Sequence, residues 1–193
     1  MTDILYKYRS LANFKNFVDI ILKNRIYAAE YKNLNDPMEG QYYYGSNGLD
    51  RQIQEKLMNE KDNLRVCSLS RTSNNELMWS HYADGHRGVA IGLRIIHDEV
   101  RPIQYNGLAF IQNQDYNDQT AIEILSHKLE IWSYEEEERV FIRGSNFIDI
   151  QIEEIIIGRV MSNSNYSLVK ELTAKINSQI TILKAKEYNE FDM

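Results

Sequence analysis

The chain has 193 residues, of which 43 % are hydrophobic and 26 % are charged. These values are ordinary for a globular protein, and we expect a single domain over residues 1–193. The formal net charge of −6 argues against a basic, nucleic-acid-binding surface over the whole molecule. The single cysteine, Cys67, excludes a disulfide framework and a paired-cysteine zinc site.

The N-terminus favours a protein of the cytoplasm. Its first residues, MTDILYKYRS, lack the long apolar stretch of a signal peptide. A helix that crosses a bilayer needs about 18 or more consecutive apolar residues, and the sequence contains no such run. We therefore expect a cytoplasmic location and no membrane partner.

The predicted elements mix strands and helices along the chain. Residues 4–8 alternate as a short strand, and an apolar stripe then predicts a helix from Leu11 to Leu22. Next come a strand at 25–30, a turn-rich loop at 33–40, a helix at 49–60, a strand at 65–70, a helix at 77–84 capped by Ser73 and Glu76, and strands at 88–93 and 100–105. A helix along 122–132, strands at 137–143, 147–152, 154–160 and 180–186, and a helix around 168–176 complete the chain.

This order predicts an α+β fold with a mixed, mainly antiparallel β-sheet, in one or two parts, flanked by helices. Within the strand at 88–93, one face carries only Gly88, Ala90 and Gly92. Small residues on one face allow another part of the chain to approach the backbone closely.

Four consecutive glutamates occupy positions 135–138, directly before Arg139. If this segment is a strand, alternation places Glu135, Glu137 and Arg139 on one face. A carboxylate pair beside an arginine can accept a hydroxyl hydrogen bond or stabilise a developing cation. The alternative is an edge strand that its charges keep soluble.

Other polar groups gather in WSHYADGHRG, residues 79–88. His81, Asp84 and His86 raise the hypothesis of a metal site, but their spacing matches no zinc motif. A polar cluster at a helix end, beside the mouth of a pocket, is the interpretation we favour.

Two further stretches could hold a ligand. Lys7 and Arg9 share a strand face and suit a phosphate or carboxylate, although an ordinary solvated face would look the same. Asn35 and Asp36 lie in NDPMEG, where their first expected role is a tight turn with local backbone bonds.

These stretches together resemble a widespread bacterial domain family of unknown function. The family pattern is a KYRS start, an NDPxE turn, a WSHYAdxHxG block and a WxYExExR strand, which match LYKYRS, NDPMEG, WSHYADGHRG and WSYEEEERVF here. The resemblance spans the chain from Leu5 to about Val160 and implies no activity by itself. It singles out Glu135 and Glu137, the pair that alternation places beside Arg139.

A second resemblance, of topology and order, is to the ADP-ribosyltransferase fold. In that superfamily an early strand carries a His or Arg that holds NAD, and a late strand supplies a catalytic Glu. The likeness implies that Arg9 holds NAD, that His81 or Tyr82 lies on the nicotinamide side, and that Glu137 is the catalytic carboxylate. This chain departs from the pattern because it lacks a His at the first position and a Ser-Thr-Ser strand.

The resemblance implies an NAD-using, ADP-ribosyltransferase-like enzyme or NAD glycohydrolase, as a bacterial toxin or anti-phage effector. Its partners would be a small nucleotide and a protein or nucleic-acid acceptor. The implied catalytic residues are Glu137, Glu135 and His81, and the implied NAD-binding residues are Lys7, Tyr8, Arg9, Asn35, Asp36, Trp79, Tyr82 and Arg139. A non-catalytic ligand- or partner-binding module is the main alternative, and a metal-dependent nuclease is another.

Overall fold

The computed structural model describes residues 3–186, whose contacts group them into two compact units. The first unit contains residues 3–26, 69–97 and 149–186, and the second contains residues 27–68 and 98–148. The chain passes between the units within β2 (Arg25–Tyr27), β4 (Arg65–Ser70) and β9 (Phe147–Ile157), and once more after His97. The expectation of one domain over residues 1–193 stays a prediction.

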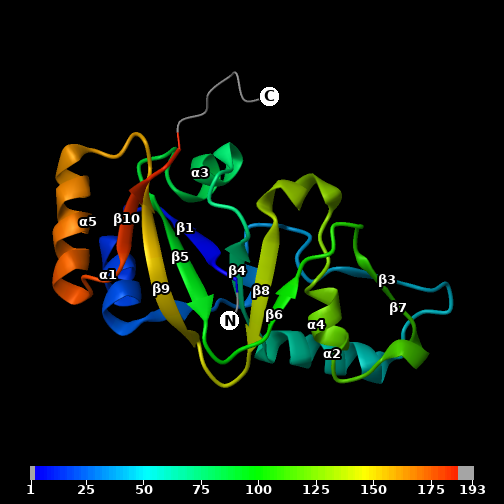
Figure 1. Ribbon diagram of the computed structural model, residues 1–193. Helices are drawn as coiled ribbons and strands as arrows, with labels where there is room; N and C mark the ends of the chain where they lie inside the picture. Colours follow the sequence, from blue (N-terminus) through cyan, green and yellow to red (C-terminus); the bar gives the residue numbers. More distant parts are fainter. Residues whose placement is uncertain (1–2, 187–193) are drawn as a thin grey trace. The chain divides into compact units, whose positions relative to one another are not determined.

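The first unit is built on strands in the order β10, β9, β5, β1 (Figure 1). Its elements are β1 (Leu5–Arg9), α1 (Phe14–Lys23), α3 (Glu76–Tyr82), β5 (Val89–Ile95), β9, α5 (Asn163–Ile176) and β10 (Thr181–Lys184). Strand β5 pairs antiparallel with both β1 and β9, whereas β10 joins β9 in parallel. Helices α1 and α5 lie side by side (Figure 1).

The strand at 88–93 does bring backbones close together, as its small residues predicted. A Cβ atom on Gly88 would lie 2.1 Å from the carbonyl oxygen of Arg9. A Cβ on Gly92 would lie 2.6 Å from the side chain of Glu154. The opposite face of β5 is apolar and completely buried, through Val89, Ile91 and Leu93. Gly88 therefore leaves room for the Arg9 carbonyl, and Gly92 leaves room for the Glu154 side chain of the paired strand β9.

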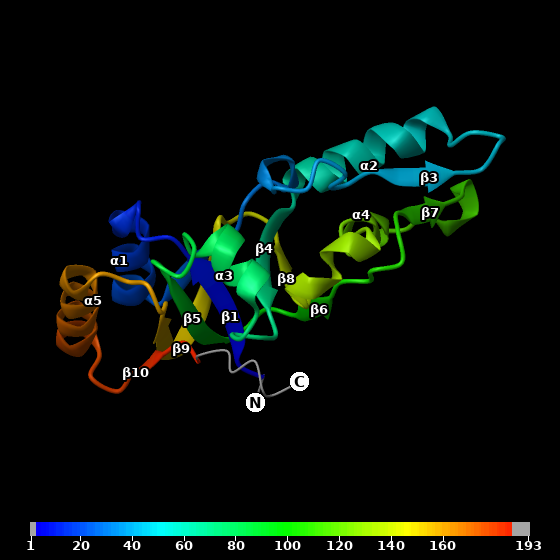
Figure 2. The same cartoon turned by 90° about the horizontal axis from the view of Figure 1, so that it is seen from above.

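The second unit has strands in the order β4, β8, β6, together with a separate parallel pair, β3 and β7. Its elements are 3-10 turn η1 (Tyr31–Asn33), β3 (Tyr42–Tyr44), α2 (Arg51–Asn63), β4, β6 (Val100–Pro102), β7 (Ala109–Ile111), η2 (Asn113–Asp115), α4 (Thr120–Ile124), η3 (Glu130–Glu135) and β8 (Glu137–Ile142). Figure 2 shows α2 running alongside β3. Leu57 of α2 and Ile124 of α4 belong to one buried apolar cluster, which forms the core of this unit.

The structure confirms the α+β class and the mainly antiparallel pairing, and it corrects several predicted elements. The helix predicted along 122–132 is wrong, because α4 ends at Ile124. After it, the backbones of Ser126 and Lys128 bond to Gln104 instead of continuing a helix. The two strands predicted at 147–152 and 154–160 form the single strand β9.

The predicted cap of the helix at 77–84 is also wrong. Asn75, not Ser73, caps α3, because its side chain accepts hydrogen bonds from the backbone N–H groups of Leu77 and Met78. Within residues 3–186, no helix has both the length and the apolar character needed to span a membrane.

The close approach at Gly88 can be tested by the substitution Gly88→Ala. The added methyl would meet a backbone oxygen, which no side-chain rotation can move away. We expect a loss on the order of 3 kcal/mol in the free energy of unfolding, measured by urea denaturation. Gly45→Ala is the control, because the nearest atom to its Cβ is a Phe110 ring carbon at 4.0 Å. Its effect should stay within about 1 kcal/mol, and equal losses for the two variants would contradict the prediction.

Candidate functional site

The residues that the sequence predicted for the site are divided between the two units. The first unit contains Lys7, Tyr8, Arg9, Trp79, His81 and Tyr82. The second unit contains Asn35, Asp36, Glu135, Glu137 and Arg139. Within the second unit, the structure brings Glu135, Glu137 and Arg139 into one buried group.

The glutamate run is not one continuous strand. Glu135 is the last residue of η3, Glu136 has a left-handed backbone with φ of 43°, and β8 begins only at Glu137. Strand alternation therefore explains why Glu137 and Arg139 share a face, but not why Glu135 joins them. The alternative of an edge strand is wrong, because β8 lies between β4 and β6 and its first four residues are buried.

Five buried side chains form what we call the buried charge network: Glu39, Lys128, Glu135, Glu137 and Arg139. The Lys128 ammonium lies 2.5 Å from Glu135 Oε2 and 3.0 Å from Glu137 Oε2. Arg139 Nε donates to Glu137 Oε1 at 2.6 Å. No side chain of the five is more than 5 % exposed. Removal of water makes each of these charge interactions stronger and makes an unpaired charge very unfavourable.

Arg139 uses every N–H group of its guanidinium inside the protein. Nη1 and Nη2 donate to the two oxygens of Glu39 at 2.5 and 2.8 Å. Nη1 also donates to the carbonyl of Leu125 at 2.6 Å, and Nη2 to Glu137 at 3.2 Å. With the bond from Nε, the guanidinium's full capacity of five donors is used. Arg139 therefore fixes β8, the NDPMEG turn and the end of α4 at one point.

Glu137 has further partners of its own. Its backbone N–H donates to the hydroxyl of Tyr105 at 2.7 Å. The Ser68 side chain on β4 also forms a hydrogen bond with its carboxylate. Both the backbone and the side chain of Glu137 are thus held in place.

The two neighbouring cations keep Glu137 ionised. Burial by itself would raise its pKa, but the charges of Arg139 and Lys128, with hydrogen bonds from Arg139 and Ser68, lower the pKa to about 2. Burial favours loss of the Lys128 proton, yet Glu137 and Glu135 outweigh it and leave the pKa of Lys128 raised. Burial raises the pKa of Glu39, and the contacts with Arg139 offset only part of that increase.

In the first unit, two predicted NAD-binding residues are core side chains. Trp79 is 1 % exposed, and its indole N–H donates to the carbonyl of Ser73 at 2.9 Å. Tyr8 packs edge-on against Trp79, and its hydroxyl donates to the carbonyl of Thr72. The indole N–H and the tyrosine hydroxyl thus both form hydrogen bonds within the protein.

The other predicted residues of the first unit are more accessible. Lys7 and Arg9 alternate along β1 and share one face, as predicted. His81 is exposed at the end of α3, where its ring lies edge-on to Tyr82. In the second unit, Asp36 makes the expected local bond, because its carboxylate accepts the backbone N–H of Met38 at 2.9 Å. Asn35, beside it, is exposed.

A second polar group, made of His86, Glu76 and Arg159, lies against the ring of Trp79. The His86 ring stacks on Trp79 with centroids 4.8 Å apart. Its Nε2 atom lies 2.8 Å from Glu76 and 2.9 Å from Arg159, and Arg159 also pairs with Glu76. Burial would raise the pKa of Glu76, but hydrogen bonds with His86 and Arg159 hold that pKa below its usual value. Left-handed backbone at Asp84, Gly85 and His86 turns the chain so that His86 reaches this position.

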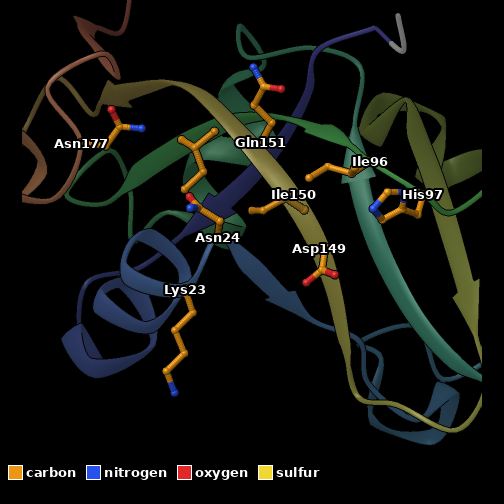
Figure 3. Close-up of a pocket in the computed structure, with 9 residues that line it drawn as sticks. Lys23, Asn24, Ile96, His97, Asp149, Ile150, Gln151 and Asn177 are labelled. Atoms are coloured by element: carbon orange, nitrogen blue, oxygen red, sulfur yellow. The ribbon is translucent and has the colours of Figure 1, made fainter.

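Residues 3–186 contain no cluster of potential metal ligands, and one pocket of the first unit does not include the predicted site residues. No three His, Cys, Asp or Glu side chains within 3–186 gather as metal ligands. A shallow pocket of about 400 Å³ in the first unit is lined by Lys23, Asn24, Ile96, His97, Asp149, Ile150, Gln151, Ile152 and Asn177 (Figure 3). Its polar side chains point in different directions in Figure 3, and none of the predicted site residues lines it.

Sequence reasoning missed several members of the two polar groups. Glu39 fits the glutamate of the NDPxE pattern, but the sequence analysis gave it no role in the site. Lys128, Tyr105 and Arg159 carry no local signal, because each is defined only by partners that lie elsewhere in the chain.

Comparisons with known proteins return no match: no family model, no curated protein and no solved structure is significantly similar to this chain. The resemblances to the bacterial domain family and to ADP-ribosyltransferases therefore stay predictions.

The buried charge network should be essential for stability. In Glu39→Gln, an amide NH₂ would face Arg139, and the guanidinium charge would lose its bidentate partner. We expect a loss of about 3–5 kcal/mol in the free energy of unfolding, measured by urea denaturation. The control is Glu55→Gln, which breaks an exposed i,i+4 pair with Arg51 and should cost about 0.5 kcal/mol or less. A loss as small as the control's would show that the network contributes little.

Glu137 should also give the protein a defined sensitivity to acid. Its pKa is about 2 in the folded chain, against an ordinary value of 4.5. The unfolded chain therefore binds the proton first, and stability that is present above about pH 4.5 is lost as pH falls towards about 2. Urea denaturation across this window should show a shallower fall for Glu137→Gln than for the wild type. The exposed neighbour variant Glu136→Gln should keep the wild-type slope, and equal slopes for all three proteins would refute this assignment.

Proposed function

We propose that the protein is an NAD-using enzyme with ADP-ribosyltransferase-like chemistry, in which Glu137 is the catalytic carboxylate. In this reaction the bond between nicotinamide and ribose breaks, and nicotinamide leaves with the bonding electrons. The ribose carbon becomes positively charged in the transition state, and an acceptor nucleophile or water then bonds to it. A fixed carboxylate beside that carbon would stabilise the developing charge.

The observation that carries the proposal is the state of Glu137. Stabilisation of a cation requires a carboxylate that is ionised and already in position before the reaction begins. Arg139, Lys128 and Ser68 hold the Glu137 side chain, and its pKa of about 2 keeps it ionised throughout the physiological range. Glu137 is also the first residue of its strand, directly after a left-handed residue, so it lies where strand and turn meet.

Burial sets a condition on this function. Glu137 is 5 % exposed, and both of its oxygens contact cations. NAD can contact this carboxylate only if some of the groups that enclose it move aside. The preceding segment, η3, is a 3-10 turn with an exposed Ile131 side chain (76 %), and it ends at the buried Glu135.

A non-catalytic ligand- or partner-binding module is the second candidate. It is favoured by the completeness of the network, in which Arg139 has no donor left over. A closed network of this kind suits a structural anchor as well as a catalytic centre. The roles of Arg9, His81 and Tyr82 towards NAD, the acceptor, and the toxin or anti-phage role remain predictions from the resemblance.

The deciding experiment is a titration with NAD by calorimetry, together with chromatographic measurement of released nicotinamide. We expect the wild type and Glu136→Gln to bind NAD and release nicotinamide. Glu137→Gln should bind NAD but release nicotinamide more slowly by on the order of 100-fold. Glu137→Asp keeps the charge and serves as a second variant if the Gln variant does not fold, which near-ultraviolet circular dichroism would reveal.

Two outcomes would overturn the proposal. If the wild type does not bind NAD, the enzyme hypothesis fails. If the wild type binds NAD without release, or if folded Glu137→Gln releases nicotinamide at the wild-type rate, Glu137 is not catalytic and the binding module is the better conclusion.

A further inference from the structure

Lys128 occupies a distinct place in the buried charge network. Its ammonium contacts Glu135 and Glu137 at 2.5 and 3.0 Å, and these two ion pairs join the glutamates. Two buried carboxylates that contact the same ammonium would repel each other strongly if that positive charge were removed. Lys128 supplies that charge from outside the glutamate run, beyond the end of α4.

Lys128 has contacts besides those with the two glutamates. Its backbone N–H donates to the carbonyl of Gln104 at 3.0 Å, and its carbonyl accepts from Gly107 at 3.2 Å. Its ammonium lies 5.0 Å from the centre of the Trp132 ring, a favourable cation–π distance. The backbone bonds hold the Lys128 main chain, and the Trp132 ring and the two carboxylates surround its ammonium.

Arg139 cannot substitute for Lys128. Three carboxylates, on Glu39, Glu135 and Glu137, meet two cations in the network. Arg139 already donates to Glu39 twice, to Glu137 twice and to the Leu125 carbonyl once. Without Lys128, the Glu135 carboxylate would lose its ion pair with the ammonium, and the negative charge around Glu137 would be poorly compensated.

We propose that Lys128 is the positioning residue of the catalytic carboxylate: its ammonium bridges Glu135 and Glu137 and fixes the orientation of Glu137. This inference rests on the catalytic role proposed above for Glu137. Arg139 and Lys128 both interact with Glu137, but within residues 3–186 Lys128 is the residue whose ion pairs join Glu137 to Glu135.

The test compares Lys128→Met with Lys128→Arg. Carboxyl carbons of glutamate are followed by NMR during a pH titration without NAD, with Glu135→Gln and Glu137→Gln used to assign their signals. In Lys128→Met, Glu137 should titrate about one to three pH units higher than in the wild type, because an opposite charge nearby is lost. Lys128→Arg should restore most of the wild-type titration. Lys128→Gln replaces the Met variant if that variant does not fold.

Nicotinamide release gives the second readout. In Lys128→Met, kcat should fall and the acid limb of its pH profile should move to higher pH with the Glu137 titration, while KM stays close to the wild-type value. The matched control is Lys61→Met, because Lys61 is another buried lysine of the second unit, and its ammonium donates to the carbonyl of Gly40 at 2.8 Å. This control should lose stability without moving the titration of Glu137.

The outcomes separate the two proposals. If a folded neutral variant leaves the Glu137 titration and the pH profile unchanged, or if Lys61→Met shifts both equally, Lys128 has no positioning role. If the titration shifts as expected but the wild type releases no nicotinamide, the proposed function fails, and Lys128 is a structural counter-ion rather than a positioning residue of catalysis.

Discussion

The guanidinium of Arg139 is the point on which the second unit depends. It is 1 % exposed and joins Glu39, one hundred positions away in sequence, to Glu137 and to the carbonyl that follows α4. An isolated charge at such a depth would be strongly unfavourable. The buried guanidinium is therefore stable only when all of these partners surround it. The turn, the helix end and the strand are therefore parts of a single cooperative arrangement.

The two polar groups of the molecule differ in how strongly they constrain their surroundings. In the first unit, the Glu76 and Arg159 side chains are 43 % and 25 % exposed, so water and salt weaken their attraction. In the second unit, the charges of Glu137 and Arg139 are fully enclosed. The first group can rearrange at little cost, whereas any change in the second affects the stability of the whole unit.

Local patterns in the sequence predicted much of the fold and a part of the candidate site. The apolar run at Arg65–Ser70 predicted β4 with the bounds that the structure has, and alternation correctly placed Glu137 and Arg139 on one face. Glu135 reaches the same cluster through a 3-10 turn and the left-handed Glu136, which alternation does not describe. Lys128 could not be predicted, because an isolated lysine has no local pattern and its role comes from distant partners.

Each unit is built from segments that are separate in the sequence, and this affects the order in which the units can fold during synthesis. The second unit has all of its residues once position 148 has been synthesised, although it begins after residues of the first. The first unit is completed later, because β5 pairs with β9, and β10 pairs with β9 only after residues 181–184 have been synthesised. During synthesis, β5 would therefore leave the ribosome long before its partner, with Ile91 and Leu93 still to be covered. The unit that contains the N-terminal strand is thus the last to be completed.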